Sequence, residues 1–210
     1  MLDTADPQSG EDDAHDQDDG ADLHAAKMRC SSGIVGDLGH AIRYLCRMSD
    51  SKPLILVTND DGITAPGIRN HLEAVRPFGH CVVVAPDSPQ SGMGHAVTLG
   101  KPLRLHRTDI FDDVEAWECS GTPVDCVKIA VDKVLHRKPD LCVSGINHGS
   151  NSSVNILYSG TMSAAVEACM EGIPSIGFSL CDYSHDHADF RAASQVVETV
   201  VRNMFHEGLP

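Results

Sequence analysis

The chain has 210 residues and a formal net charge of -14; 41% of its residues are hydrophobic and only 4% are aromatic. This composition suits one domain of ordinary size with an aliphatic core. The acidic balance argues against binding to a nucleic-acid polymer, because a surface that follows phosphates needs clustered Lys and Arg. It leaves room for one small phosphate held by a metal ion.

The cysteines indicate a reducing environment. The chain has eight, none in a C-x-x-C pair, and several, such as Cys81 and Cys142, lie inside apolar runs. This pattern is typical of reduced, buried thiols in a cytosolic protein. No stretch approaches the roughly 18 apolar residues of a membrane-spanning helix, and the acidic N-terminus does not resemble a signal peptide. We therefore expect a cytoplasmic protein that does not bind a membrane.

The first part of the chain differs in composition from the rest. Residues 1–26 are rich in Asp, Gly, Gln and His, and their low apolar content predicts disorder. Apolar residues recur at helical spacing within residues 34–46, which predicts a possible short helix there. Met48 then precedes the first strand. We expect residues 1–47 to be an acidic extension with no share in the chemistry and residues 48–210 to be the folded domain; the alternative is a regulatory tail.

Strands and helices alternate from residue 53 onward. We expect strands at 54–58, 81–86, 103–106, 114–119, 141–145 and 174–180, with 103–106 and 114–119 forming an antiparallel or edge pair. We expect helices at 66–76, at 121–135 with Thr122 as cap and Pro123 in the first position, at 161–172 and at 187–205. This alternation predicts the α/β fold class, with a mostly parallel sheet and helices on both faces.

Three polar segments follow expected strands in this scheme. They are residues 59–62, 88–95 and 144–155. Ligands of such sheets bind beyond the carboxyl ends of the strands. We therefore expect the three segments to converge on one edge of the sheet.

An adjacent acidic pair, Asp60 and Asp61, ends the first apolar strand. Two neighbouring carboxylates raise each other's pKa unless a cation intervenes. With neutral oxygens from Ser91 and Asn147, they form a ligand set for one hard divalent ion, Mg²⁺ or Mn²⁺. Such an ion polarises a phosphoryl group and activates water. From spacing alone, an acidic pair after a strand can also be a helix cap or a turn.

Five segments together resemble the SurE family of 5'/3'-nucleotidases, in order and at the expected spacing from about residue 54 to 181. They read LVTNDDGITAPGI, VVVAPDSPQSGMGHAVT, GTPVDCVKIA, PDLCVSGINHGSN and YSGTMSAAVEA. The resemblance implies a Rossmann-like, metal-dependent phosphomonoesterase that hydrolyses nucleoside 5'- and 3'-monophosphates by attack of a metal-activated water.

The resemblance also implies roles for individual residues. Asp60, Asp61, Ser91 and Asn147 match metal ligands, the same four residues that the donor chemistry selects. Asp60, Asp61 and Asn147 are the expected catalytic residues. The matching substrate-binding residues are Asn59, Asn151, Ser159, Gly160 and Thr161. Gly160 and Thr161 open a helix, whose free N–H groups favour an anion.

The chain departs from the family at its end, because family members continue for several tens of residues beyond Pro210. The missing part contributes a hairpin or arm used in subunit exchange. The expected SurE-like domain at 48–210 is therefore C-terminally truncated, and the homodimer or homotetramer of the family is in doubt here. A truncated, inactive paralogue that only binds nucleotide is the alternative function.

Two other functions fit the sequence less well. A receiver-like signalling domain needs a phospho-accepting Asp after a central strand and a Lys after a later strand, and this chain offers neither. A dinucleotide-binding oxidoreductase needs G-x-G-x-x-G after the first strand. Among single residues, His95 and His148 suggest supporting positions near the site, Asp125 and Lys128 suggest solvated positions, and the role of Glu167 stays open.

Overall fold

The computed structural model describes residues 23–27, 52–182 and 188–207. In these ranges the strands form one seven-stranded sheet in the order β1-β7-β6-β2-β3-β5-β4. The strands are β1 (Leu23–Lys27), β2 (Leu54–Thr58), β3 (His80–Pro86), β4 (Leu105–Thr108), β5 (Glu115–Cys119), β6 (Leu141–His148) and β7 (Ser175–Leu180). The strands from β7 to β5 are parallel, while β1 and β4 add antiparallel edges. The mostly parallel sheet is confirmed.

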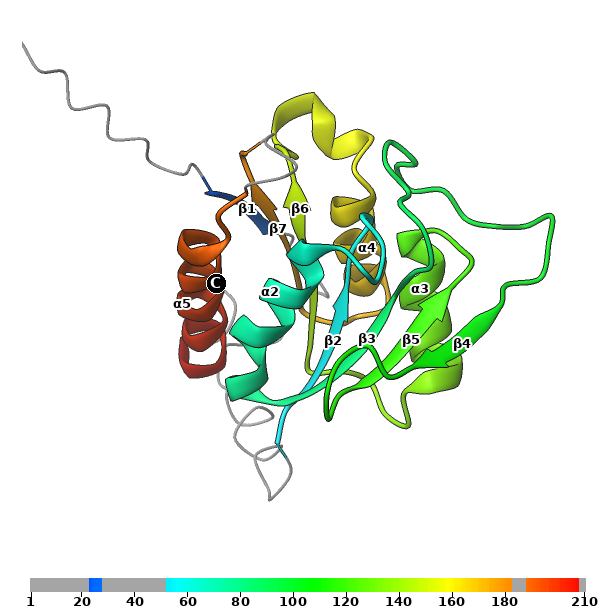
Figure 1. Cartoon of the computed structure of the whole chain (residues 1–210), viewed down its shortest axis with the longest axis horizontal. Helices are drawn as coiled ribbons and strands as arrows, with labels where there is room; N and C mark the ends of the chain where they lie inside the picture. The colour runs from blue at the N-terminus through cyan, green and yellow to red at the C-terminus, as the bar shows by residue number, and fades with distance from the viewer. Residues whose placement is uncertain (1–22, 28–51, 183–187, 208–210) are drawn as a thin grey trace, which may run out of the picture.

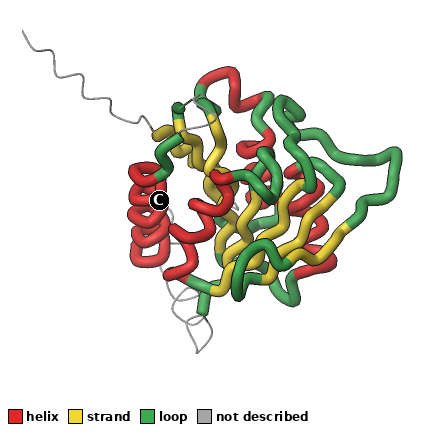
Figure 2. Tube along the Cα trace, viewed as in Figure 1, coloured by secondary structure: helices red, strands yellow, loops and turns green. Residues whose placement is uncertain are grey.

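Helices cover both faces of the sheet, as Figure 1 shows. The α-helices are α2 (Pro66–Val75), α3 (Pro123–Ile129), α4 (Gly160–Met170) and α5 (Arg191–Glu207). A π-helical turn (Ala130–Val134) extends α3, and short 3-10 turns lie at Arg76–Phe78 and Ser153–Leu157. Long loops surround these elements at the carboxyl ends of the strands (Figure 2).

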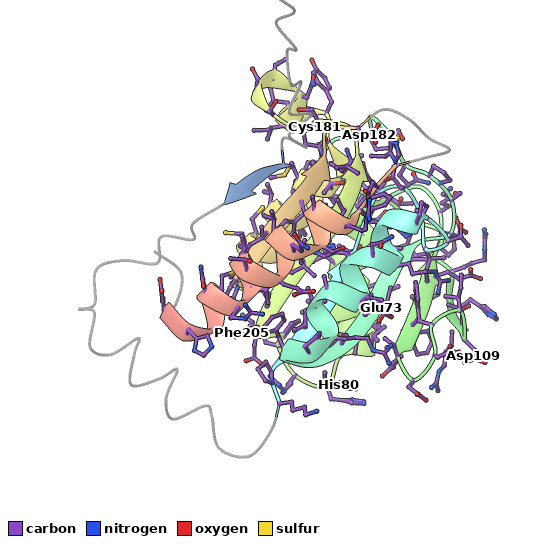
Figure 3. All side chains as sticks on the ribbon, turned by 60° about the vertical axis from the view of Figure 1, so that its left-hand side comes forward. Glu73, His80, Asp109, Cys181, Asp182 and Phe205 are labelled. Atoms are coloured by element: carbon purple, nitrogen blue, oxygen red, sulfur yellow. The ribbon has the colours of Figure 1, made fainter. Side chains whose placement is uncertain are left out.

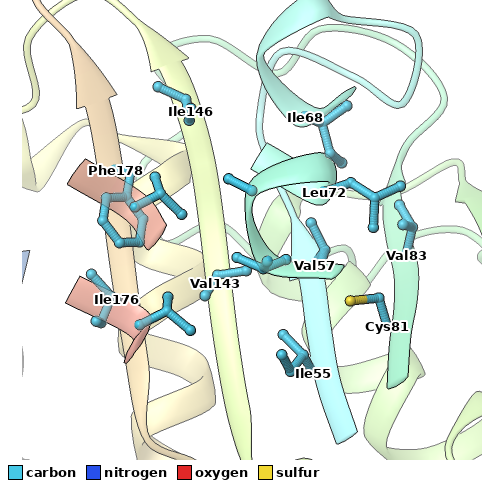
Figure 4. Packing of buried hydrophobic residues seen from close by; sticks show 14 of the residues in the cluster. Ile55, Val57, Ile68, Leu72, Cys81, Val83, Val143, Ile146, Ile176 and Phe178 are labelled. Carbon is cyan, nitrogen blue, oxygen red and sulfur yellow. The ribbon is translucent and has the colours of Figure 1, made fainter. Parts of the chain in front are cut away.

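Each buried strand serves two hydrophobic cores because its side chains alternate between the faces. Ile55 and Val57 of β2 pack with α2 and α5, whereas Leu54 and Leu56 pack on the face of α3 and α4. Figure 4 shows the first core, where Ile68 and Leu72 of α2 lie over the strands. A strand buried on both faces reads as a continuous apolar run, which explains the sequence LILVT.

The carboxyl ends of the parallel strands meet at one edge of the molecule. In Figure 3, His80 at the start of β3 lies at the bottom, and Cys181, directly after β7, lies at the top. β6 runs to His148, three residues beyond the strand that the sequence predicts, with an irregular register to β7 between Ser144 and Asn147. The expected polar loop therefore begins as strand, and Asn147 sits on a rigid element.

A tight contact joins α4 to β7. A Cβ atom placed on Gly177 of β7 would lie 2.6 Å from the sulfur of Met162. Only glycine allows the helix to approach the strand this closely. The small residues of α4 serve the same purpose, and nearly all of them are buried. The contact brings the first turn of α4 over the end of the sheet.

The structure corrects three expectations outside the central sheet. Residues 23–26 belong to the segment expected to be disordered, yet they form most of β1, whose backbone pairs with β7. The remainder of the 1–47 extension, including the expected helix at 34–46, lies outside the described residues. The expected strand at 103–106 begins only at Leu105. Cys169 is disulfide-bonded, which departs from the expectation of reduced thiols, although Cys81, Cys119, Cys126, Cys142 and Cys181 are free.

The start of α3 is a capping box. The Thr122 hydroxyl accepts a hydrogen bond from the Asp125 N–H at 3.2 Å, and the Asp125 carboxylate accepts one from the Thr122 N–H at 2.9 Å. The expected cap at Thr122 is confirmed. Asp125 is buried rather than solvated, and it also accepts a hydrogen bond from the Thr98 N–H at 3.1 Å. The carboxylate therefore ties the helix to the distant loop around Thr98.

Asp125→Asn is expected to lower the free energy of unfolding at pH 7 by about 2 kcal/mol, because hydrogen bonds to a charged acceptor are lost. Burial would raise the pKa of Asp125, but hydrogen bonds from Thr98 and Thr122 outweigh it and hold the pKa below its ordinary 3.8. The stabilisation is therefore present above that pH and is lost as the pH falls through the folded-state pKa. Urea unfolding between pH 3 and 7 measures the effect.

Asp132→Asn is the matched control, because Asp132 is exposed and pairs only with the neighbouring Lys133. A difference between Asp125→Asn and the unmodified chain that stays constant down to pH 3 would contradict the role of the charge.

Candidate active site

Asp60 lies in a buried position between β2 and α4. Only 5% of the residue is exposed, and the Thr161 hydroxyl of α4 donates a hydrogen bond to its Oδ1 at 2.5 Å. Burial raises the pKa of Asp60 to about 6; the bond from Thr161 opposes this shift, and the charge of Asp61 adds to it. No Lys, Arg or His of the described ranges forms an ion pair with Asp60. The site therefore favours an added positive charge.

The three expected segments do converge on the acidic pair. The Gln90 N–H, from the loop after β3, donates to the Asp60 carbonyl oxygen at 2.7 Å. The His148 N–H, at the end of β6, donates to Asp61 Oδ2 at 3.2 Å. Ser91 is exposed and follows Gln90 directly, so the bond of Gln90 to Asp60 brings this part of the loop next to the acidic pair.

Asn147 and Asn59 each have their amide group held in one orientation. Asn147 Nδ2 donates to the Gly149 carbonyl oxygen at 2.8 Å, and Asn59 Nδ2 donates to the Gly62 carbonyl oxygen at 2.9 Å. In both side chains the remaining polar atom is the acceptor Oδ1. Asn59 is fully buried, and its Oδ1 has no hydrogen-bond partner among the described residues. An oxygen of this kind lacks the donor or cation that burial demands.

These donors fit a hard divalent cation better than a zinc-like ion. Carboxylates of Asp60 and Asp61, the hydroxyl of Ser91 and the amide oxygen of Asn147 are all oxygen ligands, which Mg²⁺ and Mn²⁺ prefer. Within the residues that the structure describes, no cluster of three or more His, Cys, Asp or Glu could hold a metal. A ligand set with only two carboxylates is consistent with that finding. The chemistry of the set therefore fits the group that the sequence predicts.

The first turn of α4 is shaped around Asp60. A Cβ atom on Gly160 would lie 2.6 Å from the Asp60 Cβ and 3.1 Å from Pro123 Cγ. The Ser159 hydroxyl accepts from the Met162 N–H at 3.0 Å and so caps the helix. With Thr161 bonded to Asp60, both hydroxyls are already engaged within the protein. The Thr161 N–H also hydrogen-bonds Asp60, so the Gly160 N–H is the donor at the helix start that could meet an anion.

Asn151 lies in the loop after β6 and contacts β7. Its Nδ2 donates to the Ser179 hydroxyl of β7 at 2.9 Å, which holds the loop after β6 against the sheet. In this position Asn151 organises the loop, and its Oδ1 is the atom left for a ligand. Its role in binding substrate stays a prediction.

A buried carboxylate that the sequence left open joins three elements. Glu167 of α4 is 3% exposed and contacts His95 Nε2 at 2.8 Å and Lys128 Nζ at 2.6 Å. Burial would raise the pKa of Glu167, but the bonds from Lys128 and His95 hold it below its ordinary value. Lys128 is therefore an ion-pair partner rather than only a solvated side chain. Helical spacing gives no sign of this contact, because His95 comes from a loop 72 residues away.

The Ser91 loop is held to the body by further backbone contacts. The Gly94 N–H donates to the Tyr158 carbonyl oxygen at 3.0 Å, and the Thr122 hydroxyl donates to the Ala96 carbonyl oxygen at 2.6 Å. Together with His95 these contacts fix the loop on both sides. The start of α3, the turn before α4 and Glu167 of α4 therefore add long-range contacts to the hydrogen bonds within the loop.

The matching family model carries the description "Survival protein SurE" and covers residues 55–210. The chain is similar to "5'-nucleotidase SurE" of Christiangramia forsetii, with 61% identity over 165 residues, 78% of this chain and 63% of that protein. It is 61% identical over 160 residues to the protein of the same name from Cytophaga hutchinsonii, covering 76% of this chain and 61% of that protein.

A solved structure gives the same answer for the fold. The crystal structure of the SurE protein from Aquifex aeolicus matches with a TM-score of 0.67 and 41% identity, over 75% of this chain and 62% of that chain. The chain therefore spans less than two thirds of the length of these relatives.

Gly160→Ala is expected to lower the free energy of unfolding by about 1–3 kcal/mol, because the added methyl group would overlap Asp60. Denaturant unfolding measures the loss. Gly100→Ala is the control, since a Cβ atom on Gly100 meets nothing within 4 Å. Equal stability of the two variants would show that the contact between Gly160 and Asp60 is not tight in solution.

His95→Ala is expected to speed amide hydrogen exchange at Gly94 and Thr98 by about tenfold, because the loop loses its bond to a buried carboxylate. Exchange measured by NMR or mass spectrometry would detect the change. His106→Ala serves as control, since His106 is an exposed residue of β4. Unchanged exchange in His95→Ala would mean that the backbone contacts alone hold the loop.

Proposed function

The chain belongs to the SurE family, and from that premise we propose that it is a metal-dependent phosphomonoesterase that hydrolyses nucleoside 5'- and 3'-monophosphates. The observation that carries the proposal is the buried carboxylate of Asp60, held by Thr161 beside Asp61 with no cationic side chain paired to it. An oxygen-rich site at the carboxyl edge of a parallel sheet suits a phosphate bound through a cation.

Each site residue has a distinct task in this proposal. Asp60, Asp61, Ser91 and Asn147 would hold one Mg²⁺ or Mn²⁺ ion. When bound, such an ion supplies Lewis-acid polarisation of the phosphoryl group and lowers the pKa of water. Thr161 orients the Asp60 carboxylate, and the Gly62 and Gly149 carbonyl oxygens orient the amides of Asn59 and Asn147.

The phosphate would lie at the start of α4. The Met162 N–H is taken by the Ser159 hydroxyl, and the Thr161 N–H hydrogen-bonds Asp60, so the Gly160 N–H is the donor left for the phosphate. It would stabilise charge on the phosphoryl oxygens as it develops. Water attacks phosphorus, a new P–O bond forms, and the ester P–O bond breaks. The ester oxygen leaves with a proton as the hydroxyl of the nucleoside.

We place this reaction in the cytoplasm, a proposal that the free buried thiols support and that the disulfide at Cys169 does not. Among the described residues, no helix is long and apolar enough to cross a bilayer.

Asp60→Asn is expected to lower kcat/KM for AMP with Mn²⁺ by about a thousandfold, because the cation loses a charged ligand worth several kcal/mol. Phosphate release measures the loss. Asp109→Asn is the control, because Asp109 is exposed on the far side of β4 (Figure 3). In water enriched in oxygen-18, one labelled oxygen should enter each phosphate, whereas a trapped aspartyl phosphate would overturn attack by water.

The same assay separates the alternative. A chain that binds AMP with Mn²⁺ in calorimetry but releases no phosphate would be an inactive nucleotide-binding protein. The shortened length relative to its relatives is the reason to make that measurement.

A further inference from the structure

A cavity of about 440 Å³ lies next to the loop that carries Gln90 and Ser91, and the proposed hydrolysis gives the basic residues of its wall no role. Two sides come from the ends of β3 and β5, through Ser88, Gln90 and Thr122. The third side is the long loop that leads into β4, with Lys101 and Arg104. In Figure 1 this loop extends away from the sheet between β3 and β4.

Two residues of the cavity wall adjoin the candidate site. Gln90 lines it and also donates its N–H to the Asp60 carbonyl oxygen at 2.7 Å. Thr122 lines it and precedes Pro123, whose ring adjoins Gly160 at the point where Gly160 meets Asp60. A substrate with its phosphate at Asp60 would therefore extend into this space.

The basic wall is held in place by hydrogen bonds. The Arg104 N–H donates to the Ser120 hydroxyl at 2.9 Å, and the Ser120 N–H donates back to the Arg104 carbonyl oxygen at 3.0 Å. At the other end of the loop, Thr98 is bonded to Asp125 of α3 at 3.1 Å. The backbone that carries Lys101 and Arg104 is thus anchored at both ends.

The two basic side chains of this wall have no partner for their charged groups among the described residues. Neither the Lys101 ammonium group nor the Arg104 guanidinium group makes a hydrogen bond or ion pair with another described residue. Asp87, the carboxylate of the cavity, accepts a hydrogen bond from the Ser88 hydroxyl at 2.9 Å. The cavity lining holds two cations and one carboxylate, a local positive excess in a chain with net charge -14, which indicates a site for an anion.

We propose that this cavity binds a second phosphate of the substrate, so that the preferred substrate class is a nucleotide with two phosphate groups. This inference rests on the proposed function. One phosphate lies at the acidic pair and is hydrolysed as described above, while the other is held by Lys101 and Arg104 and stays on the product. No aromatic side chain lines the cavity, so it offers a base no ring on which to stack.

The test compares three substrates on the full chain with Mn²⁺: AMP, adenosine 3',5'-bisphosphate and ADP. The bisphosphate and ADP carry the second phosphate in different places, so they distinguish a phosphate across the ribose from one in a diphosphate chain. We expect kcat/KM for the bisphosphate to exceed that for AMP by about tenfold, the contribution of one hydrogen bond between charged groups. A preference for ADP alone would assign the cavity to a diphosphate chain, and equal values for all three would overturn the proposal.

The variants Arg104→Gln and Lys101→Gln should each lower the ratio of bisphosphate to AMP kcat/KM, and the double variant should lower it by about tenfold, to the value expected without the second-phosphate site. Arg107→Gln is the matched control, because Arg107 is an exposed arginine of β4 outside the cavity. It removes the same charge three positions away and should leave the ratio unchanged. A general loss of electrostatic attraction would affect all three variants alike and would contradict a specific pocket.

Failure of this proposal is distinguishable from failure of the proposed function. If AMP is hydrolysed but Arg104→Gln lowers both substrates equally, the cavity holds the nucleoside and the second-phosphate site is wrong. If the unmodified chain hydrolyses neither nucleotide, the proposed function fails, and calorimetry of the same nucleotides decides the pocket. If the unmodified chain binds the bisphosphate more tightly than AMP and Arg104→Gln abolishes that difference, the second-phosphate site is retained. Equal binding of the two nucleotides would overturn it.

Discussion

The structure of the site depends on the burial of one carboxylate, that of Asp60. Burial alone disfavours its charge, and Asp61 beside it makes this worse. The Thr161 hydroxyl offsets part of that cost through a hydrogen bond to Oδ1. This arrangement favours the binding of a cation beside Asp60. A phosphate group could then bind to the same cation.

The rest of the fold packs closely around the Asp60 carboxylate. Gly177 lets α4 approach β7, and Gly160 lets the start of α4 reach Asp60. Glu167, about two turns further along α4, holds the Ser91 loop through His95. A single helix therefore sets both the carboxylate and the loop that faces it, which couples the packing of the sheet to the geometry of the site.

The sequence predicted most of the central sheet and the convergence of its loops, because continuous apolar runs such as LILVT and the pairing of Thr122 with Pro123 are local signals. It did not predict the length of β6, since the residues after Ile146 are polar or glycine and resemble a loop. It also missed the contact between His95 and Glu167 and the burial of Asp125. Each of these depends on partners far away in the chain, and no spacing rule reports such contacts.

The sequence identified candidate site residues with suitable hydrogen-bonding groups. It did not predict which partners within the protein those groups bind. The hydroxyls of Ser159 and Thr161 suggest phosphate ligands by type, yet one caps α4 and the other holds Asp60. The hydrogen-bonding capacity of a side chain is evident from the sequence, whereas the partner that takes it is a property of the packed chain.

The two cations of the cavity wall have a consequence for the rate of encounter. A chain with net charge -14 repels a nucleotide at long range, and only within a Debye length, about 10 Å at 0.1 M salt, can Lys101 and Arg104 dominate. Added salt screens the distant repulsion more strongly than the close attraction. Association should therefore become faster at moderate ionic strength, the opposite of a protein that draws its ligand in from afar.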